Sequence, residues 1–488
     1  MKMTKEQIKR SETQCKQCML AKKEQINIQG KNLTIWPLFF LDQRQQNEDG
    51  VDICATALGV SSLSHFLSGD SSGEIRAAVS EGVSTLLFVR NEDGSWPSKI
   101  SRLARDDVAM EGVINDTYNA LNALVKTGFI SYSPLINIVK DPKTGEQLDQ
   151  LEKRLAIADK SMEWLLDNRA GQGWGYTGTQ YLRGAAEGIP AYTVPSANAV
   201  MIISQISGIE KTLRSDSPLD QRINQAVRET VDWMCDIQNE DGGFGIKRGE
   251  RSRVGNTAKV LLALCEASEK VDCASTVFEA MDKAADFILK TYDPENVSFE
   301  SVSEDFFQFS VETSSPKVNL FKRPIIHELY LEPLVIDALN QYYKKRVSVT
   351  ATQPIQNRIR MNNRVCRKLK VASEDLIRHQ VSDGNLAGAI HSRRSTEYEY
   401  YPVYACSDAI SAFDMFLKNP ELANRVNTLT VKNLIFICGS VVAAGSLILL
   451  GIIGKVPCLM AIITMLLVPV AVNLISNAIW KAIVDWLN

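Results

Sequence analysis

The sequence predicts an all-α protein, built from six repeated helical hairpins and followed by two membrane-spanning helices. Two observations lead to this prediction. The tetrapeptide Asn-Glu-Asp-Gly occurs at residues 47–50, 91–94 and 239–242, each time between two stretches with a helical pattern. Near the C-terminus, two long uncharged apolar stretches follow one another at residues 433–454 and 456–480. A recurring turn indicates an internal repeat, and a repeat determines the fold.

Three degenerate copies of the turn complete a set of six. They lie at residues 171–175, 293–299 and 382–384, and each follows an apolar, helix-like stretch. Each unit then consists of an outer helix, a glycine-rich turn, a variable loop and an inner helix. The predicted inner helices are residues 53–63, 116–127, 196–207, 256–267, 332–341 and 405–417. Because one hairpin cannot bury its apolar face alone, neighbouring units must stack.

The turn sequence has a physical basis. Glycine tolerates the left-handed conformation that ends a helix, and the preceding aspartate can accept hydrogen bonds from nearby backbone amides. In two copies an aromatic residue, Trp96 or Phe244, comes two positions after the glycine. We expect this ring to pack against the neighbouring unit.

The turns resemble the Gln-Trp motif of terpenoid cyclases, most closely at Gln238 and residues 241–244. The resemblance covers about residues 33–418. It extends to the β subunits of protein prenyltransferases and to the thioester domain of complement proteins. It implies an α6/α6 toroid, in which six hairpins close on themselves; an open helical solenoid is the alternative. The predicted domains are a polar helical extension (1–32), the toroid (33–424) and a C-terminal transmembrane hairpin (425–488).

The two apolar stretches contain 22 and 25 residues, and about 20 residues span a bilayer. Only Lys455 and a proline separate them, so we expect a helical hairpin with both ends on one side of the membrane. Trp480 suits an interfacial position. The basic residues that flank the domain side favour a cytoplasmic toroid, and they are Arg425, Lys432 and Lys481. A hairpin buried inside a soluble domain is the alternative.

Composition sets only bounds, and we expect no cofactor and no metal site, with nucleic acid not the expected partner. The net charge is only −3, and no secretory signal appears in the polar first thirty residues. Ten cysteines without framework spacing fit a reducing compartment. Cys15 and Cys18 form one C-x-x-C pair without a second pair, and the four histidines are dispersed. Two ordinary cysteines on an N-terminal helix are the simpler interpretation.

Asp116 is the candidate catalytic residue. Terpenoid cyclases that start by protonation use an Asp-x-Asp-Asp motif at the start of an inner helix. The resembling segment here is residues 113–117, in which Val113 and Asn115 differ from the motif and Asp116 alone matches. A helix cap is the alternative role for Asp116. The zinc ligands of the prenyltransferases and the thioester sequence of the complement domain have no match, so the standard catalytic motifs are missing.

Asp106 and Asp107 form a small acidic cluster in the second loop. They loosely resemble the magnesium-binding motif of ionisation-type terpene synthases. An exposed, salt-bridged loop is the alternative, because Arg102 and Arg105 adjoin the cluster.

A second local set precedes the fourth inner helix and is basic. The prenyltransferases place basic residues at the rim of the toroid to bind a diphosphate, and guanidinium groups suit phosphate oxygens. The set that this resemblance assigns to anion binding is Lys247, Arg248, Arg251 and Arg253. A solvated loop, partly balanced by Glu250, is the alternative.

Aromatic residues are candidates for the lining of a central cavity, where rings stabilise carbocations in cyclases. They are Trp174, Tyr176, Tyr192, Phe244 and Tyr404. Packing between hairpins is the alternative and the default.

Nine Lys or Arg and no acidic residue lie between Lys344 and Lys370. On a membrane-tethered domain such a patch can lie against anionic headgroups. A nucleotide or nucleic-acid surface and a solvated basic face are the alternatives. The helical part, called the basic patch below, comprises Arg358, Arg360, Arg364, Arg367, Lys368 and Lys370.

Together, these features suggest a membrane-anchored toroid that binds, and in one interpretation transforms, an apolar isoprenoid-type ligand. The missing motifs favour binding over catalysis. The alternative is a non-catalytic toroid that senses a peptide, lipid or nucleotide and controls a C-terminal effector hairpin. That hairpin would insert into the bilayer or form homo-oligomers.

Overall fold

The computed structural model describes most of the chain up to Lys418. The described residues are 5–37, 40, 52–97, 112–136, 138, 140–175, 191–213, 219–268, 274–293, 299–301, 328–347, 355–391 and 403–418. All belong to one compact unit, Thr4–Lys418. Within this part of the chain, no helix is both long enough and apolar enough to cross a membrane. The predicted spans at 433–454 and 456–480 lie outside the described residues.

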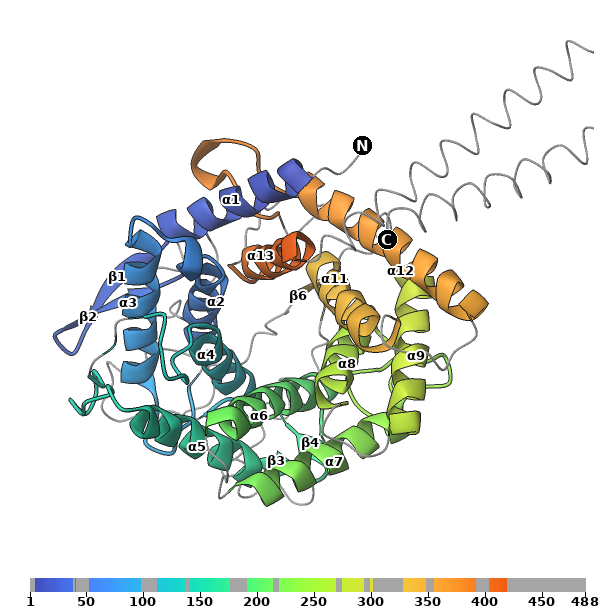
Figure 1. The fold of residues 1–488 in the computed structure, drawn as a ribbon, viewed down its shortest axis with the longest axis horizontal. Helices are drawn as coiled ribbons and strands as arrows, with labels where there is room; N and C mark the ends of the chain where they lie inside the picture. Colours follow the sequence, from blue (N-terminus) through green and yellow to red (C-terminus); the bar gives the residue numbers. More distant parts are fainter. Residues whose placement is uncertain are drawn as a thin grey trace, which may run out of the picture. The chain divides into compact units, whose positions relative to one another are not determined.

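The helices of this unit form two concentric layers (Figure 1). The inner layer consists of α2 (Ile53–Ser64), α4 (Ile114–Lys126), α6 (Thr193–Leu213), α8 (Val254–Ala267), α11 (Leu331–Tyr342) and α13 (Val403–Lys418). The outer layer consists of α1 (Lys5–Ala21), α3 (Glu74–Val89), α5 (Leu151–Asp167), α7 (Asp220–Ile237), α9 (Ala274–Thr291) and α12 (Ile355–Arg378). All six predicted inner helices are confirmed.

The inner layer is a closed ring. Each inner helix packs against the next, from α2 through α4, α6, α8 and α11 to α13, and α13 packs against α2. Each inner helix also packs against the outer helix that follows it, and α13 packs against α1. Closure through the α13–α2 contact confirms the toroid and excludes the open solenoid.

Helix α1 belongs to the ring, although the sequence suggested a polar extension outside the repeats. Its side chains Ile8, Cys15 and Met19 are buried. Gln380 Nε2 donates to the Ser11 carbonyl at 2.8 Å, which ties the sixth turn to α1. The helix is polar on average, and its narrow apolar face is what packs against α13. The first repeat therefore begins at α1, and the boundary at residue 32 does not separate it from the toroid.

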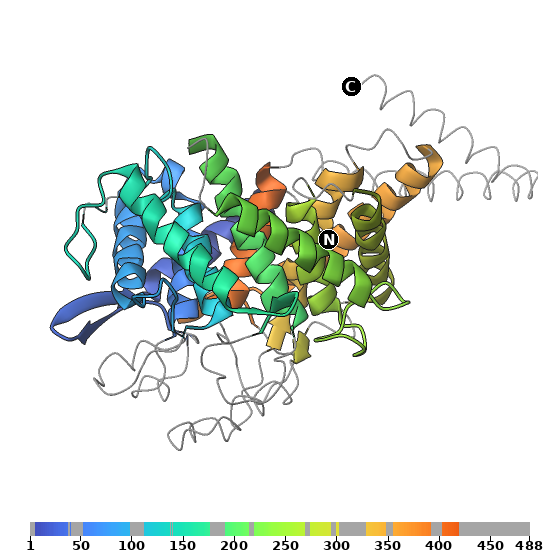
Figure 2. The ribbon, with the colours of Figure 1, turned by 90° about the horizontal axis from the view of Figure 1, so that it is seen from below.

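Short antiparallel β-hairpins connect several helices. They are β1 (Glu24–Ile28) with β2 (Lys31–Ile35), β3 (Arg169–Ala170) with β4 (Gly173–Trp174), and β5 (Phe299–Ser301) with β6 (Glu328–Tyr330). Two 3-10 turns, Leu67–Gly69 and Gly384–Leu386, and a π-helical turn, Tyr343–Val347, complete the described elements. Seen edge-on, β5 and β6 lie at one edge of the ring (Figure 2), and β6 leads directly into α11.

The two Asn-Glu-Asp-Gly turns that the structure describes have the same geometry. The N–H of Asn91 donates to the Ser95 carbonyl at 2.9 Å, and that of Asn239 to the Gly243 carbonyl at 3.0 Å. The aspartate of each turn accepts a backbone N–H two residues on, at 2.9 Å in both. This is the role that the sequence predicted for it. The copy at residues 47–50 lies outside the described part.

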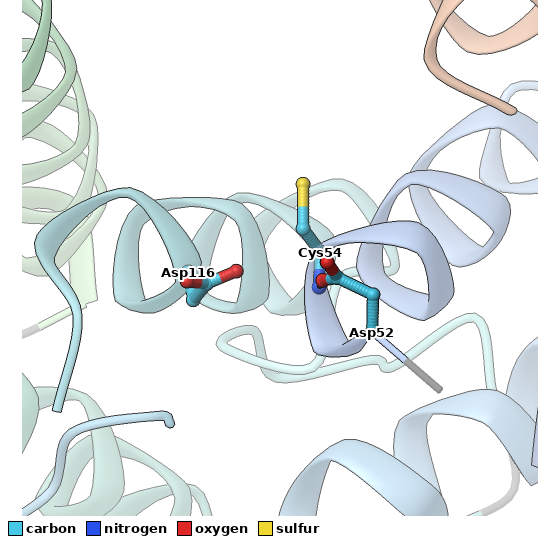
Figure 3. A group of neighbouring side chains, drawn as sticks. All are labelled: Asp52, Cys54 and Asp116. Atoms are coloured by element: carbon cyan, nitrogen blue, oxygen red, sulfur yellow. The ribbon is translucent and has the colours of Figure 1, made fainter. Parts of the chain in front are cut away.

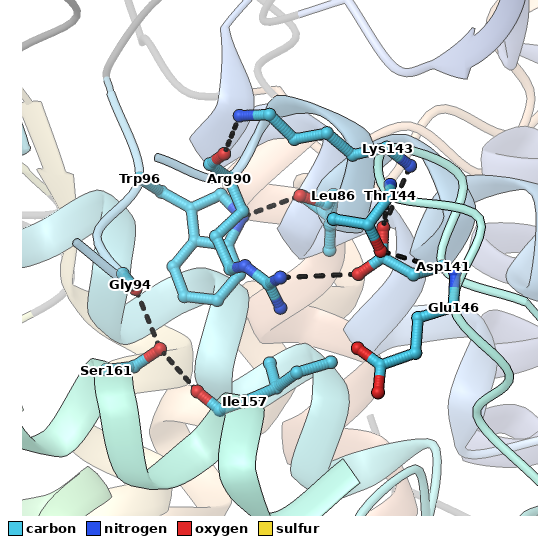
Figure 4. A network of polar contacts seen from close by, with 10 residues as sticks. All are labelled: Leu86, Arg90, Gly94, Trp96, Asp141, Lys143, Thr144, Glu146, Ile157 and Ser161. Atoms are coloured by element: carbon cyan, nitrogen blue, oxygen red, sulfur yellow. Dashed lines mark hydrogen bonds and ion pairs between the residues drawn. The ribbon is translucent and has the colours of Figure 1, made fainter. Parts of the chain in front are cut away.

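Each of these turns packs against the outer helix of the following unit. Gly94 has a φ of 91°, and a Cβ built on it would lie 2.7 Å from the Lys160 carbonyl group on α5. Gly242 has a φ of 86°, and its Cβ would lie 2.6 Å from the Lys283 carbonyl oxygen on α9. Ser161 Oγ donates to the Gly94 carbonyl at 2.7 Å (Figure 4). Glycine is therefore required both for the backbone angle and for close packing.

In each of the first four units, one aromatic residue joins the two layers. Its backbone N–H donates to a hydroxyl on the fourth residue of the inner helix. These pairs are Trp36–Thr56 (3.4 Å), Trp96–Thr117 (3.0 Å), Trp174–Ser196 (2.8 Å) and Phe244–Thr257 (2.9 Å). The three indole N–H groups donate to carbonyls near the end of the outer helix, at Met19 (2.8 Å), Leu86 (2.8 Å) and Leu165 (2.7 Å). The aromatic side chains therefore pack inside the wall of the ring.

One buried arginine holds the connection between α4 and α5. Arg154 is 3% exposed, and its guanidinium donates to the carbonyls of Phe129 (2.8 Å), Ser131 (2.7 Å) and Leu148 (2.6 Å). The middle of the connection is held by Asp141, which pairs with Arg90 at 3.3 Å (Figure 4). These contacts attach the connection to the end of α3.

Candidate functional site in the interior of the ring

One face of helix α4 is polar and half-buried. Asn115, Tyr118, Asn119, Asn122 and Lys126 recur every three or four residues along the helix, and most residues between them are buried. This spacing places all five on one side of an α-helix. The opposite pattern, an apolar inward face, would be typical of a cavity for an apolar ligand.

Charged side chains on four inner helices show that the polar face of α4 points into the ring. Lys126 on α4 interacts electrostatically with Asp337 on α11 and Asp408 on α13. Lys259 on α8 interacts with the same two carboxylates. Since the ring neighbours of α4 are α2 and α6, its interaction with α11 and α13 runs across the interior. The four side chains therefore face the interior, and we call them the interior charge cluster.

The members of the interior charge cluster do not neutralise one another by direct contact. Within the described structure, none of the four forms an ion pair at 4.0 Å or less, and each is half-buried. Protein surrounds them on every side of the ring, yet they retain solvent exposure. The interior thus offers two ammonium groups and two carboxyl groups to a ligand.

The interior charge cluster has perturbed acid–base properties. Burial, and to a smaller extent the charge of Asp408, raises the pKa of Asp337 to about 7, although Lys126 and Lys259 oppose the shift. Burial also raises the pKa of Asp408 and lowers that of Lys126. A carboxyl group with a pKa near 7 exchanges its proton near neutral pH, as a general acid or base does.

A second cluster lies where α2 and α4 begin (Figure 3). Asp52 is the N-cap of α2 and accepts the Cys54 N–H at 2.8 Å. Asn119 Nδ2 donates to Cys54 Sγ at 3.0 Å. The sulfur of Cys54 and one carboxylate oxygen each of Asp52 and Asp116 all lie within 4.8 Å of one another. We call Asp52, Cys54 and Asp116 the Asp-Cys-Asp cluster.

Asp116, the predicted catalytic residue, is the third residue of α4 and is 7% exposed. The alternative role of helix cap is wrong: the N-cap is Val113, and no side chain caps this end of the helix. Burial raises the pKa of Asp116 well above its ordinary value, and the charge of Asp52 adds to the shift. Burial likewise raises the pKa of the Cys54 thiol. Deprotonating this cluster is therefore unfavourable unless a cation balances it.

Asp52 and Cys54 were not among the residues predicted from the sequence. Asp52 caps the first inner helix and Cys54 is its second residue, while Asp116 comes at the start of the second inner helix. An Asp-x-Cys sequence at the start of an inner helix is the signal that could have identified them, because corresponding ends of neighbouring helices meet in a stacked repeat.

A hydrogen-bond chain joins the other end of α2 to α13. His65 Nδ1 lies 2.8 Å from Asp414 Oδ2, and Ser411 Oγ lies 3.4 Å from His65 Nε2. Lys418 also pairs with Asp414 at 2.8 Å. Burial lowers the pKa of His65. Burial alone would raise the pKa of Asp414, but its hydrogen bonds to His65 and Lys418 more than offset this and lower it. The chain fastens the contact that closes the ring.

The predicted anion-binding residues are divided between ion pairs and solvent. Lys247 lies 3.5 Å from Glu250, Arg248 pairs with Asp236, Arg251 is exposed and Arg253 is half-buried. Diphosphate binding at this rim stays a prediction. The acidic pair Asp106 and Asp107 lies outside the described residues.

Most of the predicted cavity aromatics lie in the wall of the ring. Trp174 and Phe244 are fully buried, and Tyr192 is 7% exposed. These three residues therefore pack between hairpins, which was the alternative role. Tyr404 is half-buried at the second position of α13, and Tyr176 lies outside the described residues.

The basic patch lies on the outer helix α12, partly paired. Arg364 pairs with Asp286 on α9 at 2.7 Å, Lys368 donates to the Tyr292 carbonyl, and Lys370 lies 3.9 Å from Glu374. Arg367 is exposed. Arg358 and Arg360 belong to the first turns of the same helix. Contact of this patch with a membrane surface stays a prediction.

The Cys15–Cys18 pair meets a third cysteine. The thiol of Cys18 lies close to that of Cys406 on α13, and all three cysteines are buried. They lie between α1 and α13, where the sequence alone could not place them.

No family model matches the sequence, and no curated protein matches it. Solved structures resemble the fold at low sequence identity. The Lin0763 protein from Listeria innocua aligns with a TM-score of 0.51 and 11% identity, over 85% of this chain and 98% of that one. A GH76 alpha-mannanase from Bacteroides thetaiotaomicron aligns at 0.49 and 12%, over 87% and 97%. The type II terpene cyclase MstE from Scytonema aligns at 0.45 and 10%, over 86% and 98%. At such identities the likeness concerns the α/α toroid alone.

Proposed function

We propose that the toroid binds a small polar ligand between the charged side chains of its interior. One observation carries the proposal: Lys126, Lys259, Asp337 and Asp408 come from four inner helices and interact across the ring without a direct ion pair. A partly buried charge without a partner is costly, whereas a ligand that supplies the partner recovers that cost.

The chemistry of the interior charge cluster defines the class of ligand. Ammonium groups bind carboxylate or phosphate oxygens, and carboxylates accept hydrogen bonds from hydroxyl or amino groups. The ligand would therefore carry an anionic group together with hydroxyl or amino groups. An apolar isoprenoid chain would leave these charges unpaired in a drier environment. The isoprenoid-type ligand stays the alternative for this site.

Binding is the proposed activity, and Asp337 is the residue that would support catalysis if the ligand is transformed. Its pKa of about 7 gives it a proton to donate or accept at neutral pH. In that case turnover of the ligand should depend on pH. The Asp337→Asn substitution should abolish this turnover while the ligand still binds.

The C-terminal sequence favours a second candidate function. The uncharged stretches at 433–454 and 456–480 fit a bilayer anchor, with the toroid in the cytoplasm. In this candidate the toroid is a sensor, the basic patch faces anionic lipid, and the hairpin inserts or oligomerises when the ligand binds. Toxicity on expression that disappears when the chain is cut after Asn424 would support it, and equal toxicity of both chains would contradict it.

Native mass spectrometry of the full chain, purified in detergent, tests the proposal. We expect one polar small molecule per chain, identified after denaturing extraction. The Lys126→Met/Lys259→Met variant should lose it, because methionine keeps the length of lysine without its charge. Lys160→Met, on the exposed side of α5, is the matched control and should retain it.

The same measurement separates the alternatives. A co-purifying prenyl lipid that survives the double substitution would contradict the polar ligand and favour the isoprenoid one. An empty ring in the unsubstituted protein would contradict a tightly bound resident ligand of either class.

A further inference from the structure

The Asp-Cys-Asp cluster has the composition of a metal site. Two carboxylates and a thiol converge from the first turns of α2 and α4, with one donor atom of each within 4.8 Å of the others (Figure 3). Zinc binds sulfur at about 2.3 Å and carboxylate oxygen at about 2.0–2.2 Å, so donors on one tetrahedral ion are about 3.5 Å apart. Small rotations of the side chains would bring the three donors to that separation.

An unpartnered buried carboxylate is the second observation that points to a cation. Asp116 is 7% exposed, and within the described structure its carboxylate has neither a hydrogen-bond donor nor an ion-pair partner. Figure 3 shows it directed toward Asp52 and Cys54. An ionised carboxylate in this position has no hydrogen-bonded or oppositely charged partner in the described structure, and only the start of α4 favours its charge. A divalent cation between the three groups would supply that compensation.

The surroundings of Cys54 support a metal-bound thiolate. Asn119 Nδ2 donates to the sulfur at 3.0 Å, and hydrogen bonds of this kind orient a ligand and stabilise its charge. Asp52 is held in place because it also accepts the Cys54 N–H at 2.8 Å. Cys54 itself is half-buried, at the second position of α2. A fourth coordination position would therefore remain accessible from the interior.

We propose that Asp52, Cys54 and Asp116 bind one divalent transition-metal ion, with zinc the ion that this donor set fits best. Mixed thiolate and carboxylate donors favour a borderline-soft ion over magnesium or calcium, which prefer oxygen alone. Three protein ligands with one open position are typical of a catalytic rather than a structural zinc site. This inference does not depend on the interior charge cluster or on the ligand proposed for it.

Cobalt(II) titration of the chelator-treated full chain tests the site, since cobalt substitutes for zinc and absorbs visibly. We expect one cobalt per chain, with a thiolate-to-cobalt charge-transfer band and the intense visible bands of a tetrahedral ion. Added zinc should remove both. Cys54→Ala should abolish the charge-transfer band, and Asp116→Asn should weaken binding at least tenfold.

Two further variants keep the test decisive. Asn119→Ala should weaken binding by about 10- to 100-fold without removing the charge-transfer band, as expected of a residue that orients a ligand. Cys18→Ala is the matched control, because Cys18 belongs to the separate group of buried cysteines between α1 and α13. It should leave the spectrum unchanged.

Two outcomes would overturn the proposal. One is the absence of a charge-transfer band at stoichiometric cobalt in the unsubstituted chain. The other is a band that survives in Cys54→Ala or disappears in Cys18→Ala. Circular dichroism of each variant separates loss of the site from loss of the fold.

Discussion

At the scale of single residues, Gly94 meets two separate demands, and each can be measured. Its φ of 91° disfavours any side chain by about 1–2 kcal/mol, and a Cβ would also press on the Lys160 carbonyl group at 2.7 Å. We expect Gly94→Ala to lower the free energy of unfolding by about 2–5 kcal/mol in urea titration, since overpacking adds about 1–3 kcal/mol.

Gly171→Ala is the control for Gly94→Ala. Gly171 has a φ of 62°, but nothing lies within 4 Å of the position of its Cβ. We expect Gly171→Ala to lower the free energy of unfolding by only about 1–2 kcal/mol, because only the backbone angle is unfavourable for alanine. Equal losses in the two variants would show that the turn does not pack against α5.

Thr117 shows how one hydroxyl joins the layers. It is fully buried and accepts the Trp96 N–H at 3.0 Å. Thr117→Val keeps the shape but leaves that N–H without an acceptor, so we expect a loss of about 1–3 kcal/mol in unfolding free energy. Thr117→Ser keeps the acceptor and should cost about 1 kcal/mol, from one lost methyl group. Tryptophan fluorescence during urea unfolding measures both, and a valine variant as stable as the serine variant would contradict this role.

Local signals explain what could be predicted at this scale. The turns were recognisable because Asp93, Gly94 and their counterparts act within a few residues of one another. Asp116 was recognisable only by its place in a helix. Its partners Asp52 and Cys54 were not recognised. Their Asp-x-Cys sequence is a local signal, but they approach Asp116 only when two repeats stack.

At the scale of elements, Arg154 determines the conformation of the connection between α4 and α5. Its planar guanidinium reaches carbonyls at both ends of that connection, Phe129 and Leu148. A lysine ammonium cannot span them. We expect Arg154→Lys to lower the unfolding free energy by roughly 3 kcal/mol, because several charge-assisted hydrogen bonds are lost. Limited proteolysis should then cut within residues 127–150.

The control for Arg154→Lys is Arg222→Lys, which affects an exposed pair with Asp167 at 2.6 Å. Exposed ion pairs contribute little to stability. We therefore expect the unfolding free energy of Arg222→Lys to change by less than about 1 kcal/mol, with no new proteolytic cleavage. Unchanged proteolysis of Arg154→Lys would mean that the connection is held by other contacts.

The helices were predicted from the sequence more reliably than their arrangement. Inner helices begin after a recognisable turn and are apolar on most sides, so their positions followed from the pattern, although α6 extends beyond the predicted 196–207 at both ends. Helix α1 is polar on average, and only the packing of Ile8, Cys15 and Met19 on α13 shows that it belongs to the outer layer.

At the scale of the whole molecule, the interior charge cluster makes stability depend on pH. The pKa of Asp337 is about 7 in the folded chain and about 4 when unfolded. Below pH ~4 both states are protonated; as pH rises through ~7 the unfolded state ionises first, so folding is progressively disfavoured.

We therefore expect Asp337→Asn to gain stability over the unsubstituted chain as pH rises from about 4 to 8. The gain should reach at most about 4 kcal/mol, since one pKa unit corresponds to about 1.4 kcal/mol. Urea unfolding at a series of pH values measures it. Asp232 is exposed on α7, so Asp232→Asn is the control variant. Parallel pH profiles of the Asp337→Asn variant and the unsubstituted chain would contradict the interior position of Asp337.

Closure of the ring makes its two end helices interdependent. Deleting residues 4–21 removes the outer cover of α13 and the Met19 carbonyl that binds the Trp36 indole. We expect this chain to lose its near-ultraviolet circular dichroism and to aggregate on size-exclusion chromatography. The chain that ends at Lys418 is the control. It keeps the whole compact unit and should unfold in one cooperative transition.

The contact between His65 and Asp414 also has a consequence for synthesis. The two residues are 349 positions apart, and the ring cannot close before the second of them leaves the ribosome. At about 5–20 residues per second, that interval is about 20 to 70 s. Throughout that interval, the sides of α1 and α2 that α13 later covers stay exposed. The nascent chain, rather than the finished protein, is then the species most exposed to aggregation and proteolysis.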